Sequence, residues 1–211
     1  MNLSSRMRAA LVVTTVVLIL AAGTFLFIRG HGFDARAEPG RIETAVATRL
    51  RALAIPASAR DRVNPEPANN ESFEDGLAHF ADHCAACHGN DGSGDTDYGR
   101  GLYPKPPDMR LAPTQSLTDG ELFYLIERGV PFTGMPAFGS GTAEGEAASW
   151  RLVHFIRRIP SLTDEELGRM AELNPMSAAA WQQRQEELEF LRGEGDAPAP
   201  APVHKHSGGS Q

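Results

Sequence analysis

The sequence predicts an all-α fold, and three observations carry that prediction. Apolar residues recur at helical spacing in several segments, for example at Phe73, Leu77, Phe80 and Ala81. Two other segments open with a Thr-x-x-Glu capping box, the pattern that marks a helix N-terminus. Between these segments lie stretches rich in the chain's 21 glycines and 15 prolines, which are typical of loops.

The N-terminal residues 1–30 are predicted to hold a single membrane-spanning helix. Leu11 to Ile28 carries no charge, and a helix of this length reaches about 27 Å, close to the thickness of a bilayer core. Arginines precede this run, so the N-terminus is expected inside and the rest of the chain exported. This places the chain in the cytoplasmic membrane as a single-pass protein facing the periplasm. The alternative is a cleaved signal peptide, because Ala35-Arg36-Ala37 has the small-x-small form of a cleavage site.

Residues 31–70 are predicted to be a spacer next to the membrane. A short helix is expected from Ile42 to Ile55, with apolar residues on one stripe. After it, Pro56, Pro65 and Pro67 predict irregular chain.

Residues 71–160 are predicted to form the main folded domain, built from three helices. The first runs from about Phe73 to Ala85, with Ser72 as its N-cap. The second follows Thr118 to about Arg128, and the third runs from about residue 143 to 159. The residues between helices one and two are rich in Gly, Asp and Pro and are expected to be loops.

Two segments follow this domain. Residues 161–193 are predicted to be a helical extension that opens with a capping box at Thr163 and Glu166. Residues 194–211 have the composition of a disordered tail. Its His204 and His206 could bind Cu(II) or Ni(II) weakly, or they could be incidental residues of a solvated tail.

The net charge of −7 is unevenly distributed and argues against one class of partner. Residues 1–70 are net +4, residues 71–160 are net −6, and residues 161–211 are net −5. An acidic folded region argues against binding to nucleic acid, which requires clustered Lys and Arg. It suits docking on the basic face of a partner protein.

The two cysteines of the chain both lie in Cys84-Ala85-Ala86-Cys87-His88, the attachment motif of c-type haem. Two thiols on one helical turn can bond one edge of the porphyrin, and His88 then lies under the iron as an axial ligand. A structural zinc site would need a second cysteine pair, which the sequence lacks. A redox dithiol would not require the histidine. The motif therefore predicts one covalently bound haem c.

The residue on the other side of the iron decides whether the haem carries electrons or binds small molecules. Met135 is the leading candidate, because it stands between Gly134 and Pro136 on a predicted loop. The alternative is that Met135 only packs in a core, and the flanking Gly and Pro argue against that alternative. A thioether ligand raises the reduction potential and leaves no open coordination position. Met109 is the main rival, and the other candidates are His79, His83 and His154.

From Phe73 to Arg158 the chain resembles the class I monohaem cytochromes c. The matching features, in order, are Gly76-x-x-x-Phe80, Cys84-Ala85-Ala86-Cys87-His88-Gly89, Pro106-Pro107-Asp108, Gly129-Val130-Pro131-Phe132-Thr133-Gly134-Met135-Pro136-Ala137-Phe138 and Trp150-x-x-Val153-x-Phe155-Ile156-Arg157. The resemblance implies the class I cytochrome c fold, a small helical domain wrapped around one haem. It also implies that the first and last helices cross where Gly76 lets Phe155 approach.

The resemblance further implies that a proline carbonyl accepts a hydrogen bond from the proximal imidazole. Pro104, Pro106 and Pro107 are equal candidates for that role. The haem pocket is expected to be lined by apolar residues, namely Phe80, Leu102, Phe123, Ile126, Phe138 and Trp150.

These expectations lead to an electron carrier tethered to a membrane, without catalytic residues and with redox proteins as partners. The first alternative is an electron-transfer subunit of a larger membrane oxidoreductase, either a dehydrogenase or an oxidase. The second is a haem gas sensor or peroxidase, which would need an open position on the iron.

Overall fold

The computed structural model of the chain describes residues 4–32, 34–175 and 178–193. Within these ranges the regular structure is helical and contains no strand, as the sequence predicts. The tail with His204 and His206 lies outside the described residues. The elements, in chain order, are α1 (Ser5–His31), α2 (Arg41–Ala54), α3 (Ala57–Arg60), α4 (Asn70–His79), η1 (Phe80–Cys84), α5 (Ala85–His88), α6 (Asp97–Arg100), α7 (Ala112–Gln115), α8 (Asp119–Arg128), α9 (Ala143–Arg158), η2 (Ile159–Ser161), α10 (Asp164–Leu173) and α11 (Ala178–Leu191).

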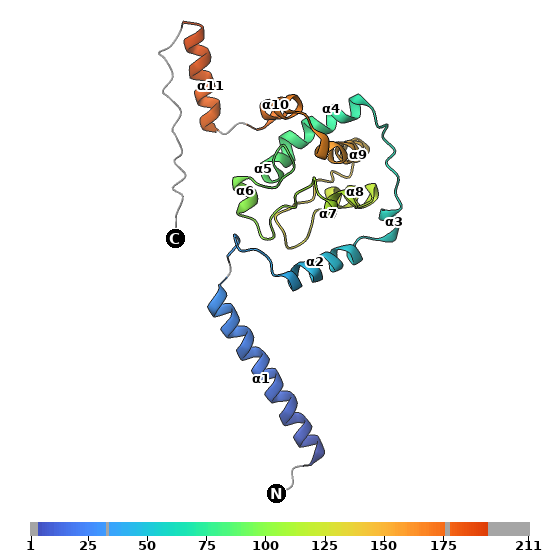
Figure 1. The fold of residues 1–211 in the computed structure, drawn as a ribbon, viewed down its shortest axis with the longest axis vertical. Helices are drawn as coiled ribbons and strands as arrows, with labels where there is room; N and C mark the ends of the chain where they lie inside the picture. The colour runs from blue at the N-terminus through green and yellow to red at the C-terminus, as the bar shows by residue number, and fades with distance from the viewer. Residues whose placement is uncertain (1–3, 33, 176–177, 194–211) are drawn as a thin grey trace.

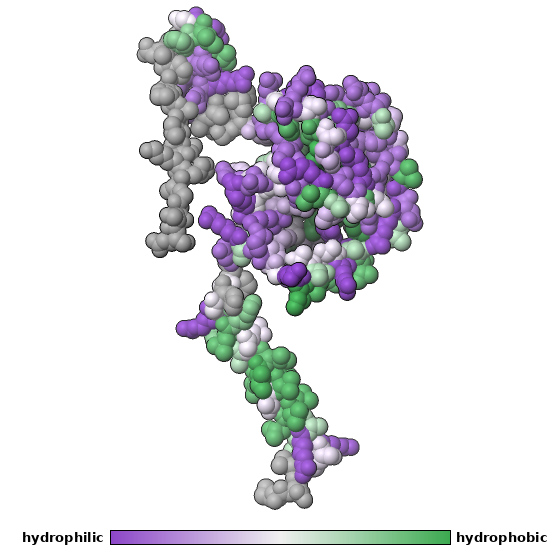
Figure 2. Space-filling model, viewed as in Figure 1, coloured by the Kyte–Doolittle hydropathy of each residue, from purple (hydrophilic) through white to green (hydrophobic). Residues whose placement is uncertain are grey.

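Helix α1 projects from a compact group of helices that runs from α3 to α10 (Figure 1). Its segment Ser5–Gly30 is long and apolar enough to cross a membrane and is the one such helix among the described residues. Its apolar side chains are exposed along the whole helix, as Figure 2 shows. A helix that is apolar on all sides and unburied by protein matches a membrane span better than a core helix.

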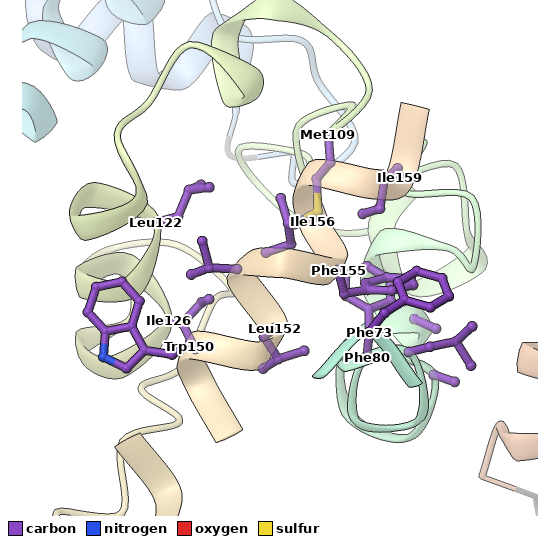
Figure 3. Packing of buried hydrophobic residues seen from close by; sticks show 14 of the residues in the cluster. Phe73, Phe80, Met109, Leu122, Ile126, Trp150, Leu152, Phe155, Ile156 and Ile159 are labelled. Atoms are coloured by element: carbon purple, nitrogen blue, oxygen red, sulfur yellow. The ribbon is translucent and has the colours of Figure 1, made fainter. Parts of the chain in front are cut away.

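The core of the folded domain is the crossing of α4 and α9, the element pair with the most extensive contact. A Cβ atom placed on Gly76 would lie 2.5 Å from the Arg151 carbonyl oxygen and 2.9 Å from the Phe155 Cβ, so only glycine fits. The close approach at Gly76 is therefore confirmed. The Phe155 ring then packs on Phe80, with ring centroids 4.9 Å apart (Figure 3).

A second aromatic contact joins α8 to the middle of α9. The rings of Phe123 and Trp150 are stacked with centroids 4.1 Å apart, and Trp150 is only 1% exposed. The Arg62 guanidinium lies over the Phe123 ring at 4.4 Å, an arrangement that ring electrostatics favours. Arg62 lies before residues 73–158, the region that resembles the class I cytochromes c. The aromatic cluster therefore includes a residue of the predicted spacer.

The predicted spacer thus contains a segment that packs on the domain. Ile55 is 3% exposed, and the Asn64 side chain donates a hydrogen bond to the Trp150 carbonyl (2.9 Å). Arg151 pairs with Glu66 at 2.9 Å. Part of the predicted spacer, from Ile55 to Glu66, therefore packs on the domain.

The helix boundaries mostly follow the predicted ones, with one correction. The capping boxes of α8 and α10 both form, and Gly129 ends α8 with φ +66°. Helix α4, however, begins at Asn70, because the Asn69 side chain accepts from the Ser72 backbone N–H (2.9 Å). Ser72 is buried inside the first turn, so its prediction as the N-cap is wrong. Short helical turns α6 and α7 also lie in the region expected to be loop.

Candidate haem site

The haem-attachment motif is presented by an interrupted helix. After α4 the chain widens into a π-helical turn, η1 (Phe80–Cys84), in which the Ala85 N–H donates to the Phe80 carbonyl five residues earlier. The α-helix then resumes as α5 and ends at His88. The sequence predicted an uninterrupted helix here, and the π turn is a correction. Single π turns inside helices occur frequently at functional sites, because the extra residue re-aims the side chains that follow.

The two thiols of the motif are half-buried and are not joined in a disulfide. Burial, and to a smaller extent the neighbouring Cys87, raise the pKa of Cys84 to about 12. Cys84 is therefore a protonated thiol at neutral pH. Such thiols are available to be bonded to a porphyrin edge.

His88 is buried, at 9% exposure, beneath the Phe80 ring at a centroid distance of 6.3 Å. Burial lowers the pKa of His88 to about 4. The imidazole is therefore neutral and has a nitrogen lone pair, which a metal ligand requires. Its Nδ1 has no hydrogen-bond partner among the described residues, so the structure selects none of the three prolines as the acceptor.

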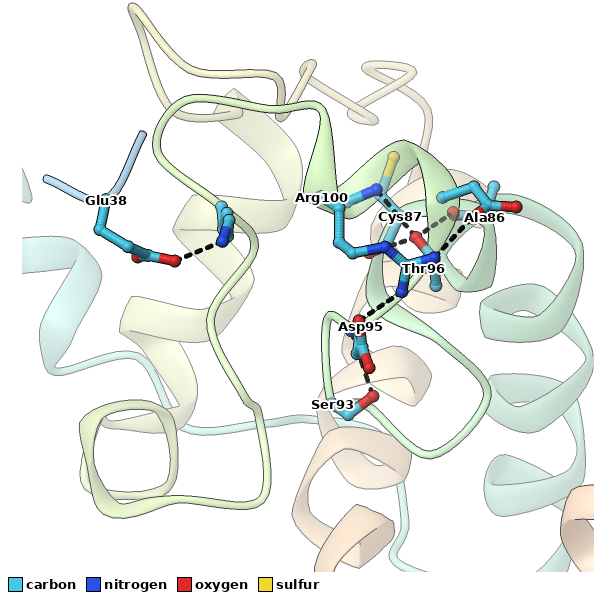
Figure 4. Close-up of polar contacts among 10 residues, drawn as sticks. Glu38, Ala86, Cys87, Ser93, Asp95, Thr96 and Arg100 are labelled. Carbon is cyan, nitrogen blue, oxygen red and sulfur yellow. Dashed lines mark hydrogen bonds and ion pairs between the residues drawn. The ribbon is translucent and has the colours of Figure 1, made fainter. Parts of the chain in front are cut away.

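The loop after His88 folds back beneath the motif and fixes its position. The His88 carbonyl accepts from the Gly94 N–H at 2.7 Å. The Thr96 hydroxyl donates to the carbonyls of Ala86 (2.8 Å) and Cys87 (3.2 Å), and it accepts from the backbone of α6 (Figure 4). Thr96 therefore ties the attachment turn to α6.

Met135 is half-buried on a loop that its own residues hold in shape. The Val130 N–H donates to the Met135 carbonyl (3.1 Å), which closes the loop. The Thr133 hydroxyl donates to the Val130 carbonyl (2.7 Å) and accepts from the Met135 N–H (3.1 Å). Phe132, between them, adopts φ +61° and is fully exposed.

The Met135 loop and the attachment motif meet through one intermediate segment. A Cβ on Gly134 would lie 2.6 Å from a methyl group of Leu102, and a Cβ on Gly99 would lie 2.7 Å from the Cys87 carbonyl oxygen. Because Gly99 and Leu102 belong to the same turn, this segment contacts both the attachment motif and the Met135 loop. The sequence predicted both motifs as one site, and the fold brings them to the two sides of one short segment.

The rival ligands lie in other surroundings. Met109 is 8% exposed in the core beside Ile156 and Ile159 (Figure 3). The His154 Nε2 lies 2.9 Å from the Glu66 carbonyl oxygen. The imidazoles of His79 and His83 pack edge to face on the helix that carries the cysteines.

The residues expected to line the pocket differ in burial. Phe80, Phe123, Ile126 and Trp150 belong to the buried core, and Phe138 packs against it while partly exposed. Leu102 is half-buried against Gly134, as described above.

A family model described as cytochrome c oxidase, cbb3-type, subunit III matches residues 71–156. Residues 71–156 are a domain of the c-type cytochrome family. No curated protein matches the chain. The matched residues begin just inside α4 and end inside α9, so they include the attachment motif, the Met135 loop and the helix crossing.

Membership in the c-type cytochromes implies covalently bound haem, and the residues present fit that group. Two reduced thiols and a buried neutral imidazole occupy one turn, and a thioether stands on the adjoining loop. The donor set therefore suits a porphyrin-held iron and supports electron transfer as the activity of the domain.

Proposed function

We propose that this cytochrome is a membrane-tethered one-electron carrier with a single haem c. Cys84 and Cys87 would bond the porphyrin edge, and His88 and Met135 would be the two axial ligands. The observation that carries the proposal is the shared segment Gly99–Leu102, which joins the attachment turn to the Met135 loop. When bound, the iron supplies a reversible one-electron couple that makes and breaks no bond in a substrate.

The side chains around the site keep both ligands in place for that couple. Burial keeps His88 neutral, so it can remain a ligand in both oxidation states. Met135 would hold the iron through its thioether, a ligand that favours the ferrous state, and would leave no open coordination position. The aromatic core of Phe80, Phe155, Phe123 and Trp150 excludes water from one side of the domain, which lowers the local dielectric constant.

The tether in this proposal is α1, with the haem domain on the periplasmic face of the cytoplasmic membrane. The arginines before the apolar run and the export that covalent haem attachment requires both support that side. The net negative charge of the domain supports the inference that its redox partner docks through a basic face.

A second candidate is an electron-transfer subunit of a larger respiratory complex, and one observation favours it. The matched family model is described as an oxidase subunit. Purification in mild detergent separates the two candidates. A catalytic subunit that co-purifies in fixed ratio would contradict the free carrier, whereas an isolated, reversibly reducible cytochrome would support it.

The same substitution at two methionines tests the coordination. In Met135→Leu we expect loss of the thioether–iron absorption band of the ferric protein, a lower reduction potential and new binding of carbon monoxide to the ferrous protein. Met109→Leu is the matched control: it conserves volume in the core, so we expect an unchanged spectrum and a stability loss below about 1.5 kcal/mol. Retention of the band in Met135→Leu, or its loss in Met109→Leu, would overturn the assignment. Carbon monoxide binding by the wild type would instead favour a sensor or a peroxidase.

A further inference from the structure

Helix α2 (Arg41–Ala54) carries an apolar stripe that no part of the domain covers. Ile42, Val46, Leu50 and Leu53 share one face of the helix, and they are 82%, 51%, 60% and 79% exposed. The other amphipathic helices of the domain, such as α8 and α9, bury their apolar stripes in the core. Figure 2 shows apolar surface along the edge of the domain where α2 lies. An exposed apolar stripe of this kind marks an interaction surface.

The position of α2 on the domain is nevertheless fixed. Near its start, the Tyr103 hydroxyl donates to the Glu43 carboxylate at 2.6 Å, and Lys105 pairs with Glu38 just before the helix. After its end, Ile55 is buried in the domain. The apolar stripe therefore stays exposed while α2 is held at both ends, and it projects from the side of the domain that carries Tyr103.

The chain connection places this stripe near the proposed membrane span. Residues 32–40 join α1 to α2, and nine residues cover at most about 30 Å when fully extended. The stretch 29–54 carries five arginines against three acidic residues, whereas residues 71–160 are net −6. An anionic surface would therefore attract the α2 region and repel the haem domain.

We propose that α2 lies in the headgroup region of the outer leaflet, with its apolar stripe in contact with anionic lipid. An amphipathic helix with an apolar stripe and several arginines is the kind of helix that binds a bilayer surface in this way. The proposal rests on the tether described above. It adds an orientation, because α2 is fixed to the domain through Glu43 and Ile55. The Tyr103 side of the cytochrome domain then faces the bilayer, and the opposite side faces the periplasm.

Hydrogen exchange on the full-length holoprotein in lipid nanodiscs tests this contact. We expect amides of residues 41–54 to exchange about tenfold more slowly when phosphatidylglycerol is added to phosphatidylcholine, and we expect high salt to reduce that difference. In the double variant Val46→Ser with Leu50→Ser, the lipid effect is expected to disappear. The matched control, Thr44→Ser with Thr48→Ser, changes the opposite face of α2 and is expected to keep it.

A photoreactive benzophenone side chain identifies the occupant of the stripe. At position 50 we expect adducts with lipid, and at position 48, on the opposite face, we expect few. Adducts at position 50 that join a second copy or another protein, or exchange rates that do not depend on lipid, would overturn the proposal. Carbonate-resistant membrane retention and an unchanged haem spectrum in the same samples show that the tether and the cofactor are intact. A failure of the α2 contact alone is thus distinguished from a failure of the tethered carrier.

Discussion

The attachment side of the haem site lies inside the helical core, whereas the Met135 side lies on a surface loop. His88 is 9% exposed and follows a helix that is packed against α9. Met135 is half-buried, and its loop is held by Thr133 and by the hydrogen bond between Val130 and Met135. The attachment side thus depends on contacts between distant parts of the chain. The hydrogen bonds that shape the Met135 loop lie within six residues, and Leu102 packs on this loop at Gly134.

This difference indicates where the domain can change without unfolding. A change on the attachment side alters the packing of α4 and α9 and so acts on global stability. In the proposed coordination, a change in the Met135 loop would act on how firmly the iron keeps its second ligand, because the loop can open without exposing the core. Matched substitutions on the two sides separate these effects.

The largest effect is expected for Gly76→Leu on the attachment side. A Cβ at this position meets the Arg151 carbonyl oxygen at 2.5 Å, and that oxygen belongs to the backbone of α9. We expect a stability loss of about 3 kcal/mol or more, seen as loss of folded holoprotein in thermal melting. Gly168→Ala in α10 is the control, because nothing lies within 4 Å of its added methyl. It is expected to stabilise by about 1 kcal/mol.

A smaller loss is expected for Thr96→Val, which removes the hydroxyl that ties the attachment turn to α6. Three hydrogen bonds of this hydroxyl are lost, and the Ala86 and Cys87 carbonyls lose a donor. We expect a stability loss of about 1–2 kcal/mol in urea unfolding, with an unchanged absorption spectrum. A shifted spectrum at full stability would contradict the division between the two sides.

The same substitution in the loop, Thr133→Val, is expected to give the opposite pattern. It removes the hydroxyl that links Val130 to Met135. We expect added imidazole to displace the thioether at about tenfold lower concentration, while the unfolding midpoint changes little. Equal imidazole affinity in Thr96→Val and Thr133→Val would show that the loop is not held by this hydroxyl.

The smallest effect is a pH dependence that arises from His79 on the attachment helix. Burial, and then the neighbouring His83, lower its pKa below 6.5, while Asp82 acts in the other direction. Near pH 6.5 the folded state therefore binds fewer protons than the unfolded state. The stability of the fold is lost as the pH falls through the pKa that His79 has in the unfolded chain. We expect wild type to lose more stability than His79→Gln between about pH 8 and pH 5 in urea titrations. Parallel curves for the two proteins would contradict this.

Much of the helical framework was predictable, because its determinants are local. The capping boxes at Thr118 and Thr163 and the stop at Gly129 require only neighbouring residues, and all three form as predicted. The crossing at Gly76 was predictable from the family resemblance, since it depends on two matched motifs. The choice of Asn69 over Ser72 as the N-cap of α4 was not predictable, because both side chains can accept the same kind of hydrogen bond.

The remaining features depend on tertiary contacts that leave little trace in local sequence. The π turn η1 follows a regular apolar stripe, so periodicity predicts an ordinary helix there. Residues 55–69 have the prolines of a linker, yet Asn64 and Glu66 bind α9 through hydrogen bonds to Trp150 and Arg151. Met170 of α10 is fully buried, a contact that its capping box does not predict.

The contacts around α9 also set an order of events during synthesis. Asn64 can bond to Trp150, and Glu74 can pair with Arg169, only after these later residues have been synthesised. Arg169 lies 95 residues after Glu74. A chain that crosses the membrane with its anchor first therefore presents Cys84 and Cys87 before the helices that close the domain have arrived. Cys84 packs against a core that α9 and α10 complete, so the thiols are more accessible before these helices have docked. The late position of these helices gives haem attachment a window in time before the fold closes over it.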